Sequence, residues 1–174
     1  MSYQIKTLDE SPDLLDNILQ NIAGQSDRDL AERIICRFRE TSLPIKVKCH
    51  EYGTPWEWYR LSFFNTEKIE VVIISTKTGY GKSAAPGLHL QIRITNRGMF
   101  DRLGELSPHI RNQILGGRDC CFCLCGCKGS NYVFGYQEQD YIKCKNIGSN
   151  FRLKDIGEDD IESVMKIVDW EVVK

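Results

Sequence analysis

Five cysteines lie within the short span from Cys120 to Cys127, and a sixth, Cys144, follows on the far side of an aromatic segment. In a reducing cell interior disulfides are disfavoured, and clustered thiols more often bind a metal ion or carry out redox chemistry. Sulfurs that share one ion must converge on it, so this cluster constrains the fold more than any other feature. Gly126 and Gly129 suit a chain that bends around an ion, because glycine reaches backbone conformations that other residues avoid.

A tetrahedral zinc site takes about four thiolate or imidazole ligands. The spacing of Cys120 and Cys123 lets one tight turn present two sulfurs to the same ion. We therefore expect one structural zinc ion, bound by Cys120, Cys123, Cys127 and Cys144. Alternative ligand sets use Cys121 or Cys125, and an iron–sulfur cluster would need the same all-cysteine chemistry.

A catalytic zinc ion commonly has histidine ligands and keeps one coordination position open. The three histidines, His50, His89 and His109, all lie outside the cysteine span. We therefore expect the metal to stabilise structure rather than to act on a substrate. Two other interpretations remain open. The cluster can be a thiol-based sensor of metal or oxidant, or a set of reduced, partly buried thiols without a metal.

Apolar residues recur at helical spacing in the N-terminal segment. The pattern predicts one helix from Pro12, capped by Ser11, and a second helix from Asp27, capped by Ser26. The segment between them is short, so we expect the two helices to pack as an antiparallel pair.

After Pro44 the apolar period changes from about 3.6 residues to 2, which is typical of a sheet. The alternation predicts four strands, near residues 45–50, 56–64, 69–75 and 88–95. Short loops join these strands, so we expect an antiparallel meander.

Helical signals return near residues 99–115, with a break near Gly104 and a new start at Ser107-Pro108. Gly116-Gly117 then ends the helix. Alternating aromatic residues from Tyr132 predict a hairpin that ends near residue 144, and acidic residues predict a last helix from about Glu158.

These elements together predict an α+β fold. It comprises an N-terminal helical pair, an antiparallel sheet of about four strands, further helices, a Cys-rich metal-clasped β-hairpin and a C-terminal helix. The glycine pair is the expected internal boundary. It separates an α+β domain at residues 1–116 from the Cys-rich hairpin and last helix at residues 117–174, and we expect the two to pack as one unit.

A second candidate site lies on one face of the predicted sheet. Two tryptophans and several polar side chains share this face if the residues that alternate with them along the strands are buried on the opposite face. Its members are Trp56, Trp58, Arg60, His89, Gln91 and Arg93. Indole, guanidinium and imidazole groups together can bind a small flat or anionic ligand, or form an enzyme's substrate site. The simpler interpretation is a sheet face partly covered by the N-terminal helices.

Composition limits the function further. The formal net charge is −1, which does not favour binding to duplex nucleic acid. The N-terminus lacks the pattern of a signal peptide, and no apolar run reaches the ~20 residues of a membrane span, so we expect a cytoplasmic protein. We find no paired carboxylates and no assignable catalytic residues. The preferred hypothesis is a non-enzymatic, zinc-stabilised soluble binding or interaction module, whose partner is an unidentified small molecule or protein.

Overall fold

The computed structural model describes residues 5–7, 12–22, 24–50, 58–78, 85–117, 131–144 and 151–172. Its contacts group into two compact units, one of residues 1–90 with 172–174 and one of residues 91–171. The boundary expected at Gly116-Gly117, between two parts that pack as one unit, stays a prediction. Helices and antiparallel strands are both present, so the chain has an α+β fold.

Two helices begin the first unit, α1 (Pro12–Gln20) and α2 (Gln25–Glu40). Both were expected, but the cap predicted at Ser26 is wrong: α2 begins at Gln25, and its N-cap is Gly24, which makes no side-chain capping bond. The Gly24 carbonyl accepts from the backbone N–H of Arg28 at 3.0 Å, and this bond closes the first turn before Ser26 can cap it. The apolar stripe of α2 is buried as expected and includes Leu30, Ile34, Ile35 and Phe38.

The main sheet has more strands than the expected four. Its strands are β1 (Ile5–Thr7), β2 (Ile45–His50), β3 (Trp58–Phe64), β4 (Glu70–Thr78) and β5 (Ala85–Ile92), in that order. The pairs β1–β2, β2–β3 and β3–β4 are antiparallel. β5 begins and ends three residues earlier than predicted. It ends early because the backbone N–H groups of Thr95 and Asn96 bind the side chain of Glu171 instead of a strand.

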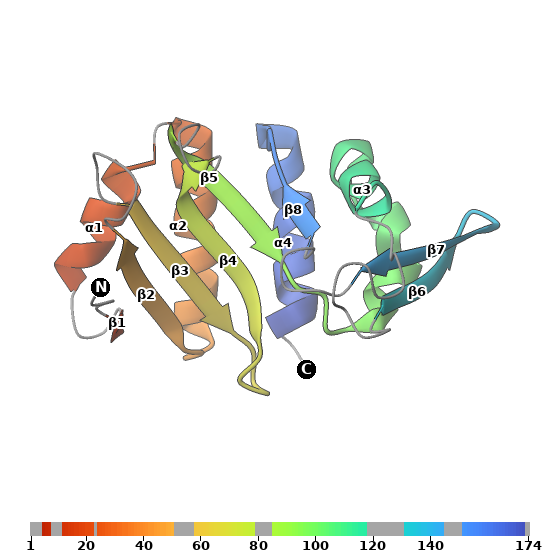
Figure 1. Cartoon of the computed structure of the whole chain (residues 1–174), viewed down its shortest axis with the longest axis horizontal. Coiled ribbons are helices and arrows are strands. Elements are labelled where there is room, and N and C mark those ends of the chain that lie inside the picture. Colours follow the sequence, from red (N-terminus) through yellow and green to blue (C-terminus); the bar gives the residue numbers. More distant parts are fainter. Residues whose placement is uncertain are drawn as a thin grey trace. The chain divides into compact units, whose positions relative to one another are not determined.

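One face of this sheet forms the core of the first unit. Leu61, Phe63, Val72 and Ile74 are all at most 1% exposed, as the alternation predicts. The ring of Phe38 on α2 lies 4.9 Å from that of Phe63, and α2 runs behind the strands in Figure 1. Full burial of each such side chain contributes about 1.5–3 kcal/mol.

The loop between β3 and β4 is short, as expected, and it is closed by a side chain. Asn65 Oδ1 accepts backbone hydrogen bonds from Glu67 and Ile69 at 3.1 and 3.0 Å. Lys68 has a φ of 60°, in the left-handed region. An asparagine side chain that replaces backbone acceptors in this way is a common means of closing a short turn.

In the second unit, a 3₁₀ helix η3 (Arg97–Glu105) precedes α3 (Pro108–Leu115). The chain leaves the helical conformation at Leu106 and Ser107, so the break predicted near Gly104 comes two residues later. Ser107 Oγ accepts from the Ile110 N–H at 3.3 Å, which confirms the predicted cap of α3. The last helix, α4 (Glu158–Val172), also begins where the acidic residues indicate.

The predicted hairpin is present as β6 (Asn131–Tyr136) and β7 (Gln139–Cys144), an antiparallel pair. Tyr132 and Phe134 are buried, whereas Val133 and Ile142 face each other across the two strands and are 56% and 37% exposed. A short strand, β8 (Phe151–Leu153), neighbours β5, whose last two residues belong to the second unit. Within the ranges given above, no helix has the length and hydrophobicity needed to cross a bilayer.

Candidate functional site

The sheet face that was proposed from the sequence is partly described. Trp58 and Arg60 on β3 are half-buried, and they alternate with the buried residues Tyr59 and Leu61. His89, also half-buried, lies on β5 in the first unit. Of the other three residues, Trp56 lies outside the described ranges, and Gln91 and Arg93 belong to the second unit.

Lysines lie over the aromatic rings on this face. The Nζ atom of Lys77 is 4.6 Å from the ring centre of Trp58, and that of Lys46 is 4.9 Å from the ring centre of Phe64. Both distances are typical of cation–π contacts. Each ring therefore already has a positive charge at its π surface.

Arg60 is held in place by an acid. Its Nη2 lies 3.1 and 3.2 Å from the two carboxylate oxygens of Glu70, the cross-strand partner of Phe64. To reach Glu70, the guanidinium must extend along the strand past Ser62. Ser62 and its cross-strand neighbour Ile73, which lie between Arg60 and Glu70 along the strands, are only 2% and 6% exposed.

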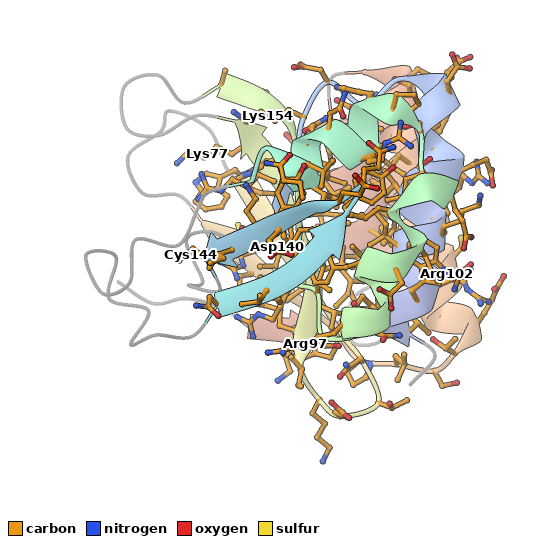
Figure 2. The ribbon with its side chains drawn as sticks, turned by 90° about the vertical axis from the view of Figure 1, so that its right-hand side faces the viewer. Lys77, Arg97, Arg102, Asp140, Cys144 and Lys154 are labelled. Atoms are coloured by element: carbon orange, nitrogen blue, oxygen red, sulfur yellow. The ribbon has the colours of Figure 1, made fainter. Side chains whose placement is uncertain are left out.

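The cysteine site lies mostly outside the described residues. Cys120, Cys121, Cys123, Cys125 and Cys127 all fall in residues 118–130. The sixth candidate ligand, Cys144, is 1% exposed at the end of β7 (Figure 2). Among the residues that the structure describes, no three histidine, cysteine or acidic side chains form a group suited to a metal ion.

The residues that flank this cysteine-rich segment are well packed. An added Cβ on Gly117 would lie 2.9 Å from the Phe151 ring, so this glycine touches Phe151 directly. The rings of Phe151 and Tyr132 are 5.7 Å apart, and Asn131, next to Tyr132, pairs with Cys144. The two ends of the segment thus belong to one packed region.

Aromatic stacking fixes the hairpin to η3. The ring of Phe134 stacks on that of Phe100 at 3.8 Å and on that of Tyr141 at 5.3 Å. The hydroxyl of Tyr132 donates to the carbonyl of Ile94 at 2.8 Å. Burial raises the pKa of Tyr132 to about 12, so this hydroxyl remains a donor at neutral pH.

A polar cluster between α3 and α4 was not anticipated from the sequence. The carboxylate of Asp160 accepts from Ser107 Oγ at 2.6 Å and from the Gly157 N–H at 3.2 Å, and it lies 2.6 Å from Nδ1 of His109. His109 Nε2 is in turn 2.9 Å from the Gln113 amide. The acidic start of α4 and the Ser-Pro start of α3 are visible in the sequence, but nothing in it indicates that the two helix starts meet.

The cluster does not have the arrangement of a nucleophilic triad. Ser107 donates its proton to Asp160 and not to the imidazole of His109, so the serine–histidine contact of such a triad is missing. Burial on its own would raise the pKa of Asp160, but hydrogen bonds from His109, Ser107 and Gly157 outweigh it and lower this pKa. Asp160 therefore acts as an ionised link between two helix starts.

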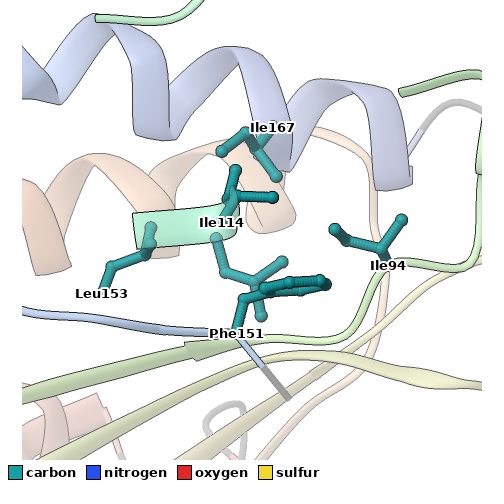
Figure 3. A pocket seen from close by; sticks show the side chains of 6 residues that line it. Ile94, Ile114, Phe151, Leu153 and Ile167 are labelled. Atoms are coloured by element: carbon teal, nitrogen blue, oxygen red, sulfur yellow. The ribbon is translucent and has the colours of Figure 1, made fainter. Parts of the chain in front are cut away.

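An apolar gap in the second unit does not provide a ligand site. Figure 3 shows the side chains around it, which come from β5, α3, β8, α4 and the segment after β5. They are Ile92, Ile94, Ile114, Phe151, Leu153 and Ile167. The space between them is too small for a water-sized molecule, so it is a packing defect of the core.

No known protein family, curated protein or solved structure matches this chain.

Proposed function

We propose that the protein is a non-enzymatic, zinc-stabilised binding or interaction module that works in the reducing cytoplasm. One structural zinc ion would be held by Cys120, Cys123, Cys127 and Cys144, with Cys121 and Cys125 as alternates. The ion would clasp the cysteine-rich segment to the β6–β7 hairpin.

The burial and position of Cys144 carry this proposal. Cys144 is 1% exposed and is paired with Asn131, which follows Cys127 by four residues. Four residues of chain span at most about 14 Å, so the hairpin and the cysteine-rich segment are tied to the same small region. A buried thiol at this position is suited to be the fourth metal ligand, in a site whose other three sulfurs come from the cysteine-rich segment.

Zinc would contribute to folding as well as to local order. Metal ligation has an apparent free energy of about 10–16 kcal/mol in small zinc domains, because the unfolded chain has no preformed site. The hairpin is held by the stacking of Phe134 on Phe100, and its strands have six residues each. An ion bound by Cys144 would add to this stabilisation.

Elemental analysis tests the proposal. Protein purified anaerobically without chelator should contain about one zinc ion per chain, and Cys144→Ser should lower this content and the melting temperature. Cys36→Ser, an exposed cysteine on α2, is the matched control and should change neither. Less than about half an equivalent of any metal would end the proposal, and iron in place of zinc would identify an iron–sulfur cluster instead.

A second candidate function is the binding or conversion of a small ligand on the sheet face of the first unit. The lysine-capped ring of Trp58 and the guanidinium of Arg60 support it, since both suit a flat or anionic molecule.

A third candidate function is a thiol-based sensor of metal or oxidant. If the cysteines form such a sensor, mild oxidant should release the metal reversibly and change the protein's conformation, whereas a permanently filled site should resist the oxidant.

A further inference from the structure

Positive charge is concentrated on the sheet face that lies opposite α2. Alternation places Lys46 and Lys48 of β2, Arg60 of β3 and Lys77 of β4 on this face. Among the described residues of these three strands, Glu70 is the acid on the same face. The described part of these three strands thus gives this face an excess of about three positive charges, in a chain whose total is −1.

The register brings like charges together. Lys48 and Arg60 are direct cross-strand partners, and Lys46 is two residues from Lys48 on the same strand. Like charges directly opposite each other destabilise a sheet, and Glu70 offsets the charge of Arg60 only. A bound anion would relieve the repulsion that remains.

Aromatic rings lie among these cations. Lys77 covers the ring of Trp58 and Lys46 covers that of Phe64, and all four side chains are exposed or half-buried. An exposed cation–π contact is weaker than the stacking of a nucleobase on an aromatic ring. A base can therefore displace a lysine from the ring, and the released ammonium group can bind the adjacent phosphate.

We propose that the sheet face formed by Lys46, Lys48, Trp58, Arg60, Phe64 and Lys77 binds single-stranded nucleic acid. A sheet face that carries both rings and cations offers stacking and phosphate contacts to an unpaired strand. A duplex hides its bases and requires an element that enters a groove, which the face of a sheet does not supply. This inference deepens the proposed binding function and does not depend on the metal.

The test uses the full protein and a fluorescein-labelled oligothymidylate of 20 nucleotides, with fluorescence anisotropy as the readout. We expect binding that weakens as salt rises. Replacement of one phosphate-binding lysine should lower affinity about fivefold at 0.1 M salt, since each contact to a single strand contributes about 0.7 to the salt slope.

Lys46→Gln and Lys77→Gln should each have this effect, and Trp58→Leu should weaken binding roughly tenfold at any salt concentration. Trp58→Phe should retain most of the affinity because it keeps a ring. Arg39→Gln is the matched charge control, because Arg39 is exposed on α2, which covers the opposite face of the sheet. Thermal unfolding of every variant separates loss of binding from loss of folding.

Three results would overturn the proposal: no binding at 20 mM salt, binding that the lysine and tryptophan variants leave unchanged, or equal affinity for a duplex of the same length. Capture by anionic phospholipid vesicles alone would identify a membrane-facing surface instead. Zinc content is measured in the same samples. A full equivalent of zinc without binding of the oligonucleotide contradicts this inference only. Binding of the oligonucleotide by protein that lacks zinc contradicts only the metal part of the proposed function.

Discussion

The two units fix their charged groups in different ways. In the first unit, Arg60 and Glu70 form an ion pair on a partly exposed sheet face, between strands that are neighbours in the sequence. In the second unit, Glu171 and Asp160 are 0% and 6% exposed, and each accepts hydrogen bonds from residues more than fifty positions away. The ion pair of the first unit thus joins adjacent strands, whereas the buried carboxylates of the second unit join distant segments.

The difference indicates where each unit is vulnerable. A surface ion pair gains little, because water and salt screen it and two long side chains lose freedom. A buried carboxylate leaves several donors unsatisfied when it is removed. We therefore expect the removal of a buried carboxylate to be costly in the second unit. Removal of a charged side chain from the sheet face of the first unit should be nearly neutral for stability.

The largest effect is expected for Glu171. Its carboxylate accepts from the backbone N–H groups of Thr95 and Asn96 at 2.8 and 3.1 Å and from the Thr95 hydroxyl at 2.5 Å. Glu171→Ala should lower the unfolding free energy by about 3–4 kcal/mol, measured by urea denaturation, because these donors lose a charged acceptor. Asp159→Ala, at an exposed position of the same helix, is the control and should cost less than about 1 kcal/mol. Equal effects of the two substitutions would contradict the contrast between the units.

An intermediate effect is expected for Asp160, and it should depend on pH. Asp160→Asn should cost about 2 kcal/mol at pH 7, because charge-assisted hydrogen bonds to His109 and Ser107 weaken. The pKa of Asp160 is lower in the folded than in the unfolded protein, so this stability is fully present above the ordinary value of 3.8. It is lost as the pH falls through the lower folded value.

Urea denaturation of wild type and Asp160→Asn between pH 7 and pH 2.5 checks this prediction. The difference in unfolding free energy between them should be constant down to about pH 4 and should then shrink. Asp159→Asn is the control, since Asp159 is exposed one residue away. A difference that grows as the pH falls below about 4 would show that Asp160 is not stabilised in its ionised form.

The smallest effect is expected for the ion pair of the first unit. Arg60 and Glu70 have side chains that are 33% and 21% exposed, and such a pair contributes about 0.5–1 kcal/mol. Glu70→Gln should therefore change the unfolding free energy by less than about 1 kcal/mol, and 0.5 M salt should remove most of that change. A loss of 2 kcal/mol or more would mean that this face is as strongly coupled as the buried carboxylates.

Periodicity predicted the elements whose signal is local. The stripe of α2, the alternation in β2 and β3 and the cap of α3 all follow from residues a few positions apart, and all are present. The strands β1 and β8 were missed because three residues are too few to show an alternation. The end of β5 was misplaced because a residue 76 positions away, Glu171, binds the backbone of Thr95.

In the candidate sites, too, local patterns could be predicted from the sequence and long-range contacts could not. Alternation was enough to assign Trp58 and Arg60 to one face. It could not predict that Lys77 covers the Trp58 ring or that Glu70 binds the Arg60 guanidinium. The Asp160 cluster could not be predicted, because it depends on two helix starts that meet only in three dimensions. The predicted zinc ligands stay a prediction, since Cys144 is the one candidate within the described residues.

The close approach of Gly117 to Phe151 has an evolutionary consequence. Even a methyl group at position 117 would meet the ring at 2.9 Å and the carbonyl of Ile114 at 3.0 Å. Alanine at position 117 therefore requires both the Phe151 ring and the end of α3 to move, so that evolution can change this residue only together with its surroundings.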